Sequence, residues 1–242
     1  MWYPILLAFL AGLATALGAL LVFVFKPTKN FISLSIGFAG GVMITLAFAG
    51  LLAEAMEISF LSAIIGFAAG AFFLLFMDTL IPHIEFSMLD KGILDKKMFK
   101  TAMLITMGIT IHNMPEGFAV TAGYQYLPAF GVFVAIALAL HNIPEGIVVA
   151  LPIISAGGSR RKAFIISMFS GLAETVGAVI GVLFFSLIGG FIPLALAFAA
   201  GVMVYLTVDE VLPMAQKYGH PHRIGFGFIA GCIIAIMIST IV

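Results

Sequence analysis

Long apolar segments alternate with short connections along the whole chain. Eight of these segments reach roughly 20 residues, the length that an α-helix needs to cross the hydrocarbon core of a bilayer. The pattern predicts an all-α, polytopic membrane protein with eight transmembrane helices. The short connections leave residues 1–242 as a single transmembrane domain. The expected spans are Tyr3–Phe25, Phe31–Glu54, Ile58–Ile81, Phe99–Ala122, Ala129–Leu151, Ala163–Ile188, Phe191–Met214 and Arg223–Val242.

The composition agrees with this class, because 63% of the residues are hydrophobic and only 9% are charged. A soluble domain usually carries about a quarter charged residues. The first segment, MWYPILLAFL, has no basic residue ahead of its apolar run, so we expect a first span and not a cleaved signal peptide. Cys232 is the one cysteine, which excludes a disulfide within the chain.

The basic residues fall in, or at the edge of, every second connection. All 11 lysines and arginines belong to the connections between spans 1 and 2, 3 and 4, 5 and 6, and 7 and 8. The positive-inside rule places these four loops in the cytoplasm and both termini on the extracytoplasmic side. The expected location is the inner or plasma membrane of the cell. The basic clusters are therefore topology determinants, and we expect no nucleic-acid partner. The 11 residues are Lys26, Lys29, Lys91, Lys96, Lys97, Lys100, Arg160, Arg161, Lys162, Lys217 and Arg223.

Two expected spans of opposite direction share a short sequence. Span 2 contains FAGGVM at Phe38–Met43, and span 7 contains FAAGVM at Phe198–Met203. The similarity predicts an inverted repeat of helices 1–3 and 6–8 around helices 4–5, a plan that recurs in secondary transporters. The alternative is chance recurrence, because small residues often line contacts between membrane helices.

A polar motif occurs twice inside apolar spans, as HNMPEG at 112–117 and HNIPEG at 141–146. The histidine and glutamate of each motif are four residues apart and therefore share one helix face. Each proline frees a backbone carbonyl four residues back, which is tolerated at this depth only against protein or a polar cavity. The short connection between spans 4 and 5 predicts antiparallel packing, which brings both motifs to one depth.

Span 6 adds a third intramembrane carboxylate, Glu174, 29 residues after Glu145. An ionised carboxylate at the bilayer centre costs roughly 2.5–3.5 kcal/mol, and no lysine or arginine lies in the interior of a span as a partner. Imidazole and carboxylate groups suit divalent ions such as Zn, Fe, Mn, Co and Cd. The sequence therefore predicts an intramembrane site for one or two divalent ions. The candidate ligands are His112, Asn113, Glu116, His141, Asn142, Glu145 and Glu174.

Three other interpretations compete with a metal site. The polar groups could only join neighbouring helices, although two motifs and an aligned third glutamate argue against this. An intramembrane metalloprotease would place a glutamate beside the first histidine, which is not the order found here. A proton-coupled carrier of an organic solute could use the three carboxylates as a relay, but it would not need the paired histidines.

The two HNxPEG motifs, together with GLAETVGA at 171–178 and FAGGVM, resemble those of the ZIP family of divalent-metal transporters, in particular its GufA/ZupT-like prokaryotic branch. The resemblance implies uptake of Zn(II), Fe(II) and related ions such as Mn(II), Cd(II) or Co(II) into the cytoplasm, with no cofactor beyond the transported metal and no enzymatic activity. It also implies a homodimer in the lipid bilayer and an elevator movement of spans 1, 4, 5 and 6 against the other four.

The resemblance further implies a binuclear centre in which Glu116 and Glu145 bridge the metals. His112, His141 and the soft contact Met43 would serve the first metal, and Asn113, Asn142 and Glu174 the second.

Polar residues near the expected cytoplasmic ends could continue the metal path. His83, Asp209 and Glu210 could form an exit relay, and the alternative is that they are interfacial residues facing water. His220 and His222 fit a solvated loop better than a capture site. The connection between spans 3 and 4 is short, whereas relatives usually have a long, histidine-rich loop there.

Overall fold

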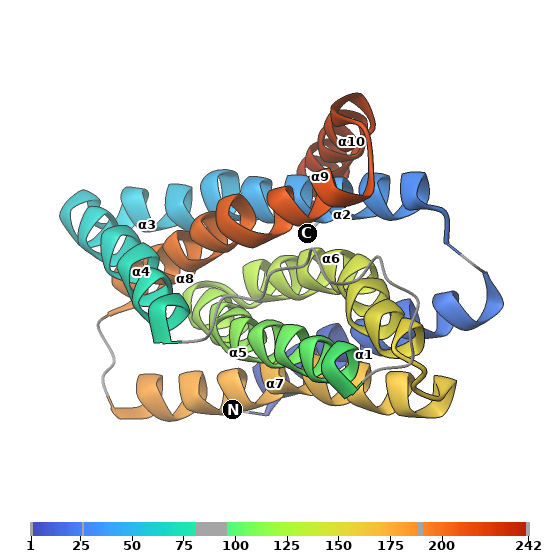
Figure 1. Ribbon diagram of the computed structural model, residues 1–242. Coiled ribbons are helices and arrows are strands. Elements are labelled where there is room, and N and C mark those ends of the chain that lie inside the picture. Colours follow the sequence, from blue (N-terminus) through green and yellow to red (C-terminus); the bar gives the residue numbers. More distant parts are fainter. Residues whose placement is uncertain (1, 26, 81–95, 188–190, 241–242) are drawn as a thin grey trace.

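The computed structural model describes residues 2–25, 27–80, 96–187 and 191–240. Every regular element among these residues is helical, which confirms the all-α class (Figure 1). In chain order the elements are α1 (Tyr3–Val24), α2 (Lys29–Thr45), η1 (Leu46–Leu52), α3 (Ala53–Ile58), α4 (Phe60–Leu80), α5 (Lys96–Tyr126), α6 (Pro128–Ser155), α7 (Arg160–Leu187), α8 (Ile192–Leu206), η3 (Thr207–Val211), α9 (Leu212–Tyr218) and α10 (Pro221–Ser239).

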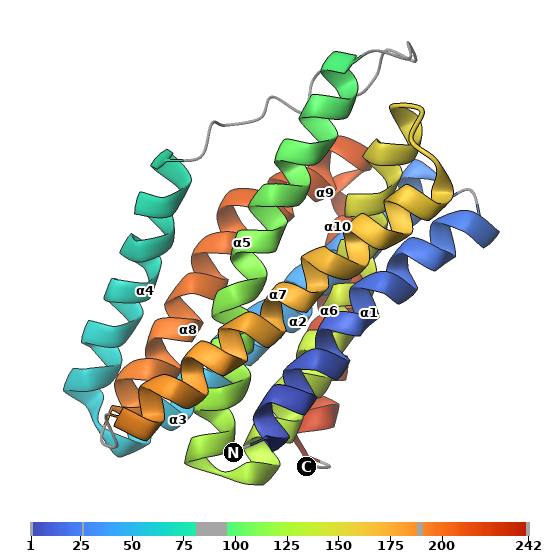
Figure 2. The same cartoon turned by 90° about the horizontal axis from the view of Figure 1, so that it is seen from below.

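The elements correspond to the eight expected spans, two of which are interrupted. Span 2 is built from α2, η1 and α3, and span 7 from α8, η3 and α9, where η1 and η3 are π-helical. Seven of the described helical stretches are long and apolar enough to cross a membrane. The remaining long helix is α5, whose 31 residues include the first polar motif. Figure 2 shows that α1 begins and α10 ends at the same side of the molecule, where α5 turns into α6.

The helices form two sets that lie against each other. Helices α1, α5, α6 and α7 pack together and are called the site bundle below. The flanking set consists of α2, α3, α4, α8, α9 and α10, in which α2 packs on α10 and α4 on α8. The two sets meet where α2 contacts α6 and where α5 contacts α8. Figure 1 shows the flanking set above the site bundle.

Glycines bring the backbones of the flanking helices into direct contact at equivalent places. A Cβ atom on Gly41 of α2 would overlap the carbonyl oxygen of Phe228 in α10. In the same way, a Cβ atom on Gly201 of α8 would overlap the carbonyl oxygen of Phe67 in α4. The α2–α10 pair is therefore the counterpart of the α8–α4 pair, in the register that aligns FAGGVM with FAAGVM.

The site bundle obeys the same symmetry. Gly12 of α1 and Gly171 of α7 each face the carbonyl oxygen of the other, so the two helices cross as equivalents. Gly146 of α6 packs on the Thr15 carbonyl of α1, and Gly117 of α5 packs on the Glu174 carbonyl of α7. These contacts confirm the inverted repeat of helices 1–3 and 6–8. They also show that α5 and α6, which lie between the repeats, are counterparts of each other in the same symmetry.

Candidate metal centre

The two polar motifs lie in the middle of α5 and α6. Both helices continue without interruption through Pro115 and Pro144, so the prolines do not break the path of the chain. The irregular turns of this fold occur instead in the flanking set, at η1 and η3. Because Gly117 and Gly146 allow backbone contact with α7 and α1, the polar side chains beside them lie in a closely packed part of the site bundle.

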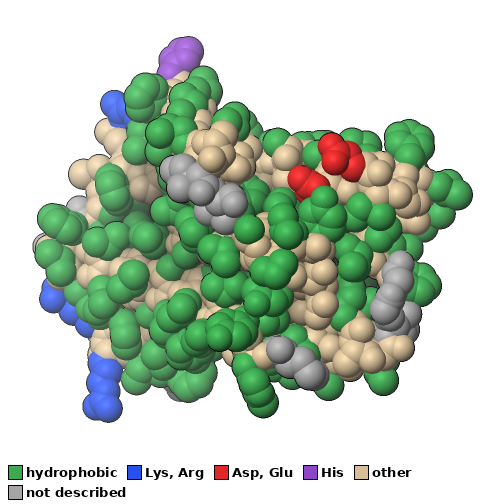
Figure 3. Space-filling view, turned by 180° about the vertical axis from the view of Figure 1, so that it is seen from behind, with side chains coloured by type: hydrophobic (Ala, Val, Ile, Leu, Met, Phe, Trp, Pro, Cys, Tyr) green, Lys and Arg blue, Asp and Glu red, His purple; other side chains and the backbone are tan. Residues whose placement is uncertain are grey.

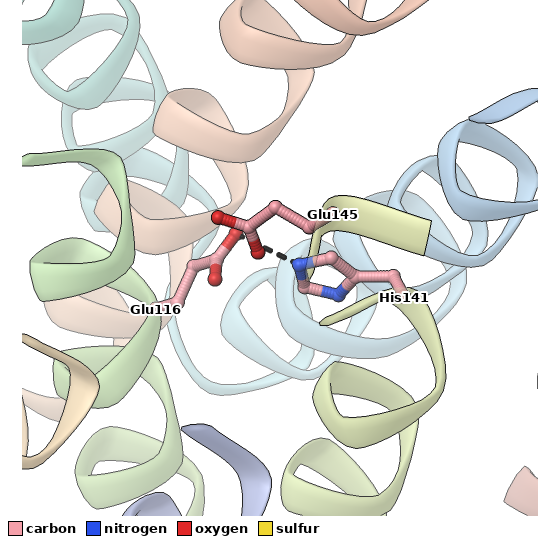
Figure 4. A group of neighbouring side chains, drawn as sticks. All are labelled: Glu116, His141 and Glu145. Atoms are coloured by element: carbon pink, nitrogen blue, oxygen red, sulfur yellow. Dashed lines mark ion pairs between the residues drawn. The ribbon is translucent and has the colours of Figure 1, made fainter. Parts of the chain in front are cut away.

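Three side chains from α5 and α6 form the centre of the site. One ligand atom each of Glu116, His141 and Glu145 lies within 4.8 Å of the others. The shortest contact joins His141 Nε2 to Glu116 Oε1 at 3.2 Å. Figure 4 shows the two carboxylates and the imidazole pointing toward one another. Ligands bound at roughly 2 Å from one metal ion are separated by distances of this order, so the three groups already have a geometry that a divalent ion can use.

The asparagines of the motifs are fixed by backbone groups of the neighbouring helices. Asn113 Nδ2 donates to the Ser170 carbonyl of α7 at 3.0 Å, and Asn142 Nδ2 donates to the Ala11 carbonyl of α1 at 2.9 Å. Ser170 and Ala11 each precede one of the paired glycines, so these two bonds are counterparts in the repeat. Asn142 Nδ2 also donates to Glu174 Oε1, which ties the third carboxylate to the site.

The site is almost completely buried and rich in unpartnered acceptors. Glu116 is 1% exposed and Glu174 is fully buried. Within the described part of the chain, several enclosed polar atoms of the site have no hydrogen-bond partner. A buried polar group without a partner costs on the order of 1–3 kcal/mol in proteins, and a cation would remove this cost. The atoms are His112 Nδ1, Glu116 Oε2, His141 Nδ1, Asn142 Oδ1, both carboxylate oxygens of Glu145, and Glu174 Oε2.

The flanking set adds two residues to one side of the site. His112 Nε2 lies 3.3 Å from Glu210 Oε1 of η3. Met43 of α2 lines the same cavity, and its sulfur accepts a hydrogen bond from the Thr207 hydroxyl at 3.8 Å. Glu210, expected only in an exit path, therefore touches a candidate ligand directly. Glu210 belongs to the π-helical segment η3, which interrupts span 7 between α8 and α9.

A cavity of about 60 Å³ connects these groups. Besides the polar residues, it is lined by apolar side chains that lie further toward the helix ends bearing the basic residues. Ile36 is near the start of α2, and Val148 follows Glu145 in α6. Ile109 precedes His112 in α5, and Met214 follows Glu210 toward Lys217. The cavity therefore extends from the cluster toward the side with the basic loops.

Other expected residues lie away from the cluster or outside the described residues. The side chain of Asp209 is exposed, and the cavity lining does not include it. His83 lies outside the described residues. His220 and His222 are exposed, with ring centroids 4.9 Å apart, at the start of α10. In Figure 3 the acidic side chains and the lysine and arginine side chains lie on opposite sides of the molecule. Glu57 of α3 is exposed, and Glu54 beside it is half-buried.

One counterpart in the repeat was not found from the sequence alone. The glycine contacts place Thr15 of α1 at the position that Glu174 occupies in α7. The sequence does contain a pattern that indicates this equivalence, because GLA and GA recur with the same spacing at 12–19 and 171–178. Thr15 is fully buried and its hydroxyl has no partner among the described residues. The substitution of a neutral for an acidic side chain makes the site unsymmetrical, with the third carboxylate on the α7 side only.

The chain was compared with known protein families and with curated proteins. The family model described as ZIP Zinc transporter matches residues 90–239. Zinc transporter ZupT of Escherichia coli O7:K1 (strain IAI39 / ExPEC) is 38% identical over 239 residues, which cover 94% of this chain and 92% of that protein. Zinc transporter ZupT of Escherichia coli (strain K12 / DH10B) has the same identity and coverage.

The fold and the site define a multi-pass integral membrane protein with a buried cluster of imidazole and carboxylate groups at its centre. The chain belongs to the ZIP family of zinc transporters, as the family match over more than half of its residues and the identity to the two relatives show. Members of this family are transporters, not enzymes.

Proposed function

We propose that this protein carries Zn(II) and related divalent ions, including Fe(II), Mn(II), Cd(II) and Co(II), across the cell inner or plasma membrane into the cytoplasm. The observation that carries the proposal is the cluster of Glu116, His141 and Glu145, whose ligand atoms lie within 4.8 Å of one another in an apolar surrounding. The relatives named zinc transporter support zinc as one cargo. No cofactor is needed beyond the transported ion.

The donor set is large enough for two metal ions. Glu116 and Glu145 would bridge them, with His112, His141 and Met43 on one ion and Asn113, Asn142 and Glu174 on the other. The three site carboxylates bring a charge of −3, and Glu210 beside His112 brings it to −4. Two divalent ions would neutralise this charge, which is the condition for holding them in a region of low dielectric constant.

The shape of the cavity supports release toward the cytoplasm. It extends from the cluster toward the side with the basic loops, which the positive-inside rule assigns to the cytoplasm, with both termini outside. The described conformation would then be open inward. We assign Glu210 to the start of the exit path, with Asp209 and, outside the described residues, His83 as its other proposed members.

A difference between the two repeats supports an elevator movement of the site bundle. Glu210 contacts His112, whereas its counterpart at the same register, Gly50 of η1, packs on Phe133. Phe133 lies eight residues before His141, the counterpart of His112. At 1.5 Å per helical residue, this offset corresponds to about 12 Å. In the opposite conformation, His141 would lie beside Gly50, as His112 now lies beside Glu210. The site bundle would reach that conformation by moving outward along the flanking set by about the same distance.

We also propose that the protein works as a homodimer of single-domain chains in the lipid bilayer. Among the seven described stretches long and apolar enough to cross a membrane, those of α4 and α10 bury the smallest share inside the chain and offer broad apolar faces. Native mass spectrometry in detergent would give twice the monomer mass for a dimer. A monomer mass at every concentration tested would exclude one.

The test is metal uptake into proteoliposomes loaded with a metal-sensing dye. Wild-type protein is compared with the His112→Ala/His141→Ala double variant for Zn(II), Fe(II), Mn(II) and Cd(II). The His220→Ala/His222→Ala variant is the matched control, because it removes two exposed histidines outside the cluster.

We expect saturable uptake by wild type and control, and none by the cluster variant. Absence of uptake by folded wild-type protein would favour a proton-coupled solute carrier. Equal uptake by all three proteins would exclude the assigned site.

A further inference from the structure

We propose that Met203 is a second thioether contact for the metal ion, used when the site is open toward the side of the termini. This inference rests on the proposed function and concerns a residue of the flanking set. Met43 would contact the ion in the described conformation, and Met203 would do so in the opposite one. A soft sulfur ligand would then be present on both sides of the transport path.

The internal repeat makes Met203 the counterpart of Met43. The two residues end the matching segments FAGGVM and FAAGVM. The contacts of Gly41 with Phe228 and of Gly201 with Phe67 show that the two segments occupy equivalent places. A π-helical turn follows each methionine within four residues, η1 after Met43 and η3 after Met203. Such turns often occur at functional positions in helices.

The two methionines lie close together where α2 passes α8. Each is 1% exposed, and both belong to one buried cluster. The Thr207 hydroxyl hydrogen-bonds both the Met43 sulfur, at 3.8 Å, and the Met203 carbonyl, at 2.7 Å. The Met43 sulfur and the Met203 backbone carbonyl therefore both lie beside the same hydroxyl group.

Only one of the two side chains reaches the cavity. Met43 lines it together with His112 and His141, whereas Met203 is buried in the apolar core and is not part of the cavity lining. Because the two halves of the molecule are related by the repeat, an opening on the opposite side would let Met203 line a cavity as Met43 does now. A thioether prefers soft ions, so this contact would favour Cd(II) over Mn(II) during loading.

A plain apolar role is the competing explanation, since methionine also fills irregular gaps in cores. Leucine separates the two roles, because a Met→Leu exchange conserves most of the volume and usually costs less than about 1.5 kcal/mol. Met203→Leu would leave the packing nearly intact and remove only the sulfur ligand. The control is Met237→Leu, at a position of α10 that is 54% exposed.

The first experiment measures initial uptake rates of Cd(II) and Mn(II) into proteoliposomes in which the side of the termini faces outward. For Met203→Leu we expect the KM for Cd(II) to rise about tenfold, the scale of losing one supporting group at a metal site. We expect kcat for Cd(II) and the KM for Mn(II) to change little. Met237→Leu should match wild type. A wild-type KM for Cd(II) in Met203→Leu would overturn the inference.

A second experiment tests exposure directly and does not depend on transport rates. Met203→Cys is introduced into a Cys232→Ser background, which removes the one native cysteine. A membrane-impermeant thiol reagent added on the side of the termini should label position 203, and Cd(II) should slow the labelling. Labelling only from the side of the basic loops, or none from either side, would contradict the inference.

The failure of this inference can be told apart from failure of the proposed function. If Met203→Leu behaves as wild type while His112→Ala/His141→Ala abolishes uptake, the transport site stands and only the role of Met203 is lost. If the histidine variant transports normally, the proposed site itself is wrong.

Discussion

At the scale of single residues, Glu116 is one of the buried carboxylates whose position demands a cation. It is 1% exposed, one carboxylate oxygen lies 3.2 Å from His141, and the other has no partner among the described residues. A buried carboxylate in this setting is costly unless a cation shares it. The cost explains why such a residue tests the assigned site better than any exposed acidic group.

Glu116→Gln keeps the shape of the side chain and removes its charge. We expect uptake to fall about 100-fold, at the upper end of losses reported for groups at metal sites, with unchanged amounts of protein in the membrane. Uptake assays and quantitative blots check the two parts. Glu57→Gln, at an exposed carboxylate of α3, is the control and should transport normally. Near-normal uptake by Glu116→Gln would refute its role as a bridging ligand.

Glu210 allows a test of metal release, because it belongs to the flanking set and contacts His112 of the site bundle. If it receives the ion during release, Glu210→Gln should lower kcat for uptake by about tenfold and alter KM much less. Steady-state kinetics of Zn(II) uptake measure this split. A larger change in KM than in kcat would instead make Glu210 a loading ligand.

At the scale of helices, close backbone contact decides where the polar side chains lie. Gly117 and Gly146 rest on carbonyl groups of α7 and α1, and the same close approach joins Gly12 to Gly171. Membrane helices without a strong hydrophobic driving force associate through such small residues. The close contact between these helices can therefore be tested by glycine-to-alanine variants, each of which adds one methyl group.

Gly117→Ala would place a methyl group into the backbone carbonyl of Glu174, which cannot move aside as a side chain could. We expect the melting temperature to drop and uptake to be lost, since overpacking typically costs about 1–3 kcal/mol. Gly108→Ala is a matched control in the same helix, because nothing lies within 4 Å of its added methyl group. Equal thermal stability of the two variants would show that α5 and α7 are not in contact as described.

At the scale of the whole molecule, charge and the repeat act together. The basic residues lie in alternate connections, while the inverted repeat gives both sides of the molecule the same helix architecture. Charge therefore distinguishes two sides that the fold makes nearly equivalent. The cavity breaks the equivalence a second time, because it extends toward one side only.

Single cysteines in a Cys232→Ser background can test the orientation in intact cells. Gln125→Cys, an exposed position in the last turn of α5, should react with an impermeant thiol reagent added outside. Ser159→Cys, in the exposed connection before α7, should react only after the cells are opened. The reverse pattern would place the basic loops outside and would turn the proposed uptake into export.

Three features could be predicted from the amino-acid sequence alone: insertion into a membrane, the all-helical class, and which polar residues lie deep in the spans. Long apolar runs are a local property, and an ionised carboxylate without a partner is costly at the centre of any bilayer. Hence the spans and the residues His112, Glu116, His141 and Glu145 could be recognised without a fold. The assignment of these residues as ligands, and of residues 1–242 as a single domain, stays a prediction.

Which of these groups contact one another, and which further residues contact them, became clear from the three-dimensional fold. Glu210 is 98 residues from His112 in the sequence, and no local pattern predicts their 3.3 Å contact. The equivalence of Thr15 with Glu174 likewise emerged from glycine contacts between helices. The physical reason is that apolar periodicity records burial against any neighbour, whereas the choice of neighbour depends on where two distant backbones can approach closely.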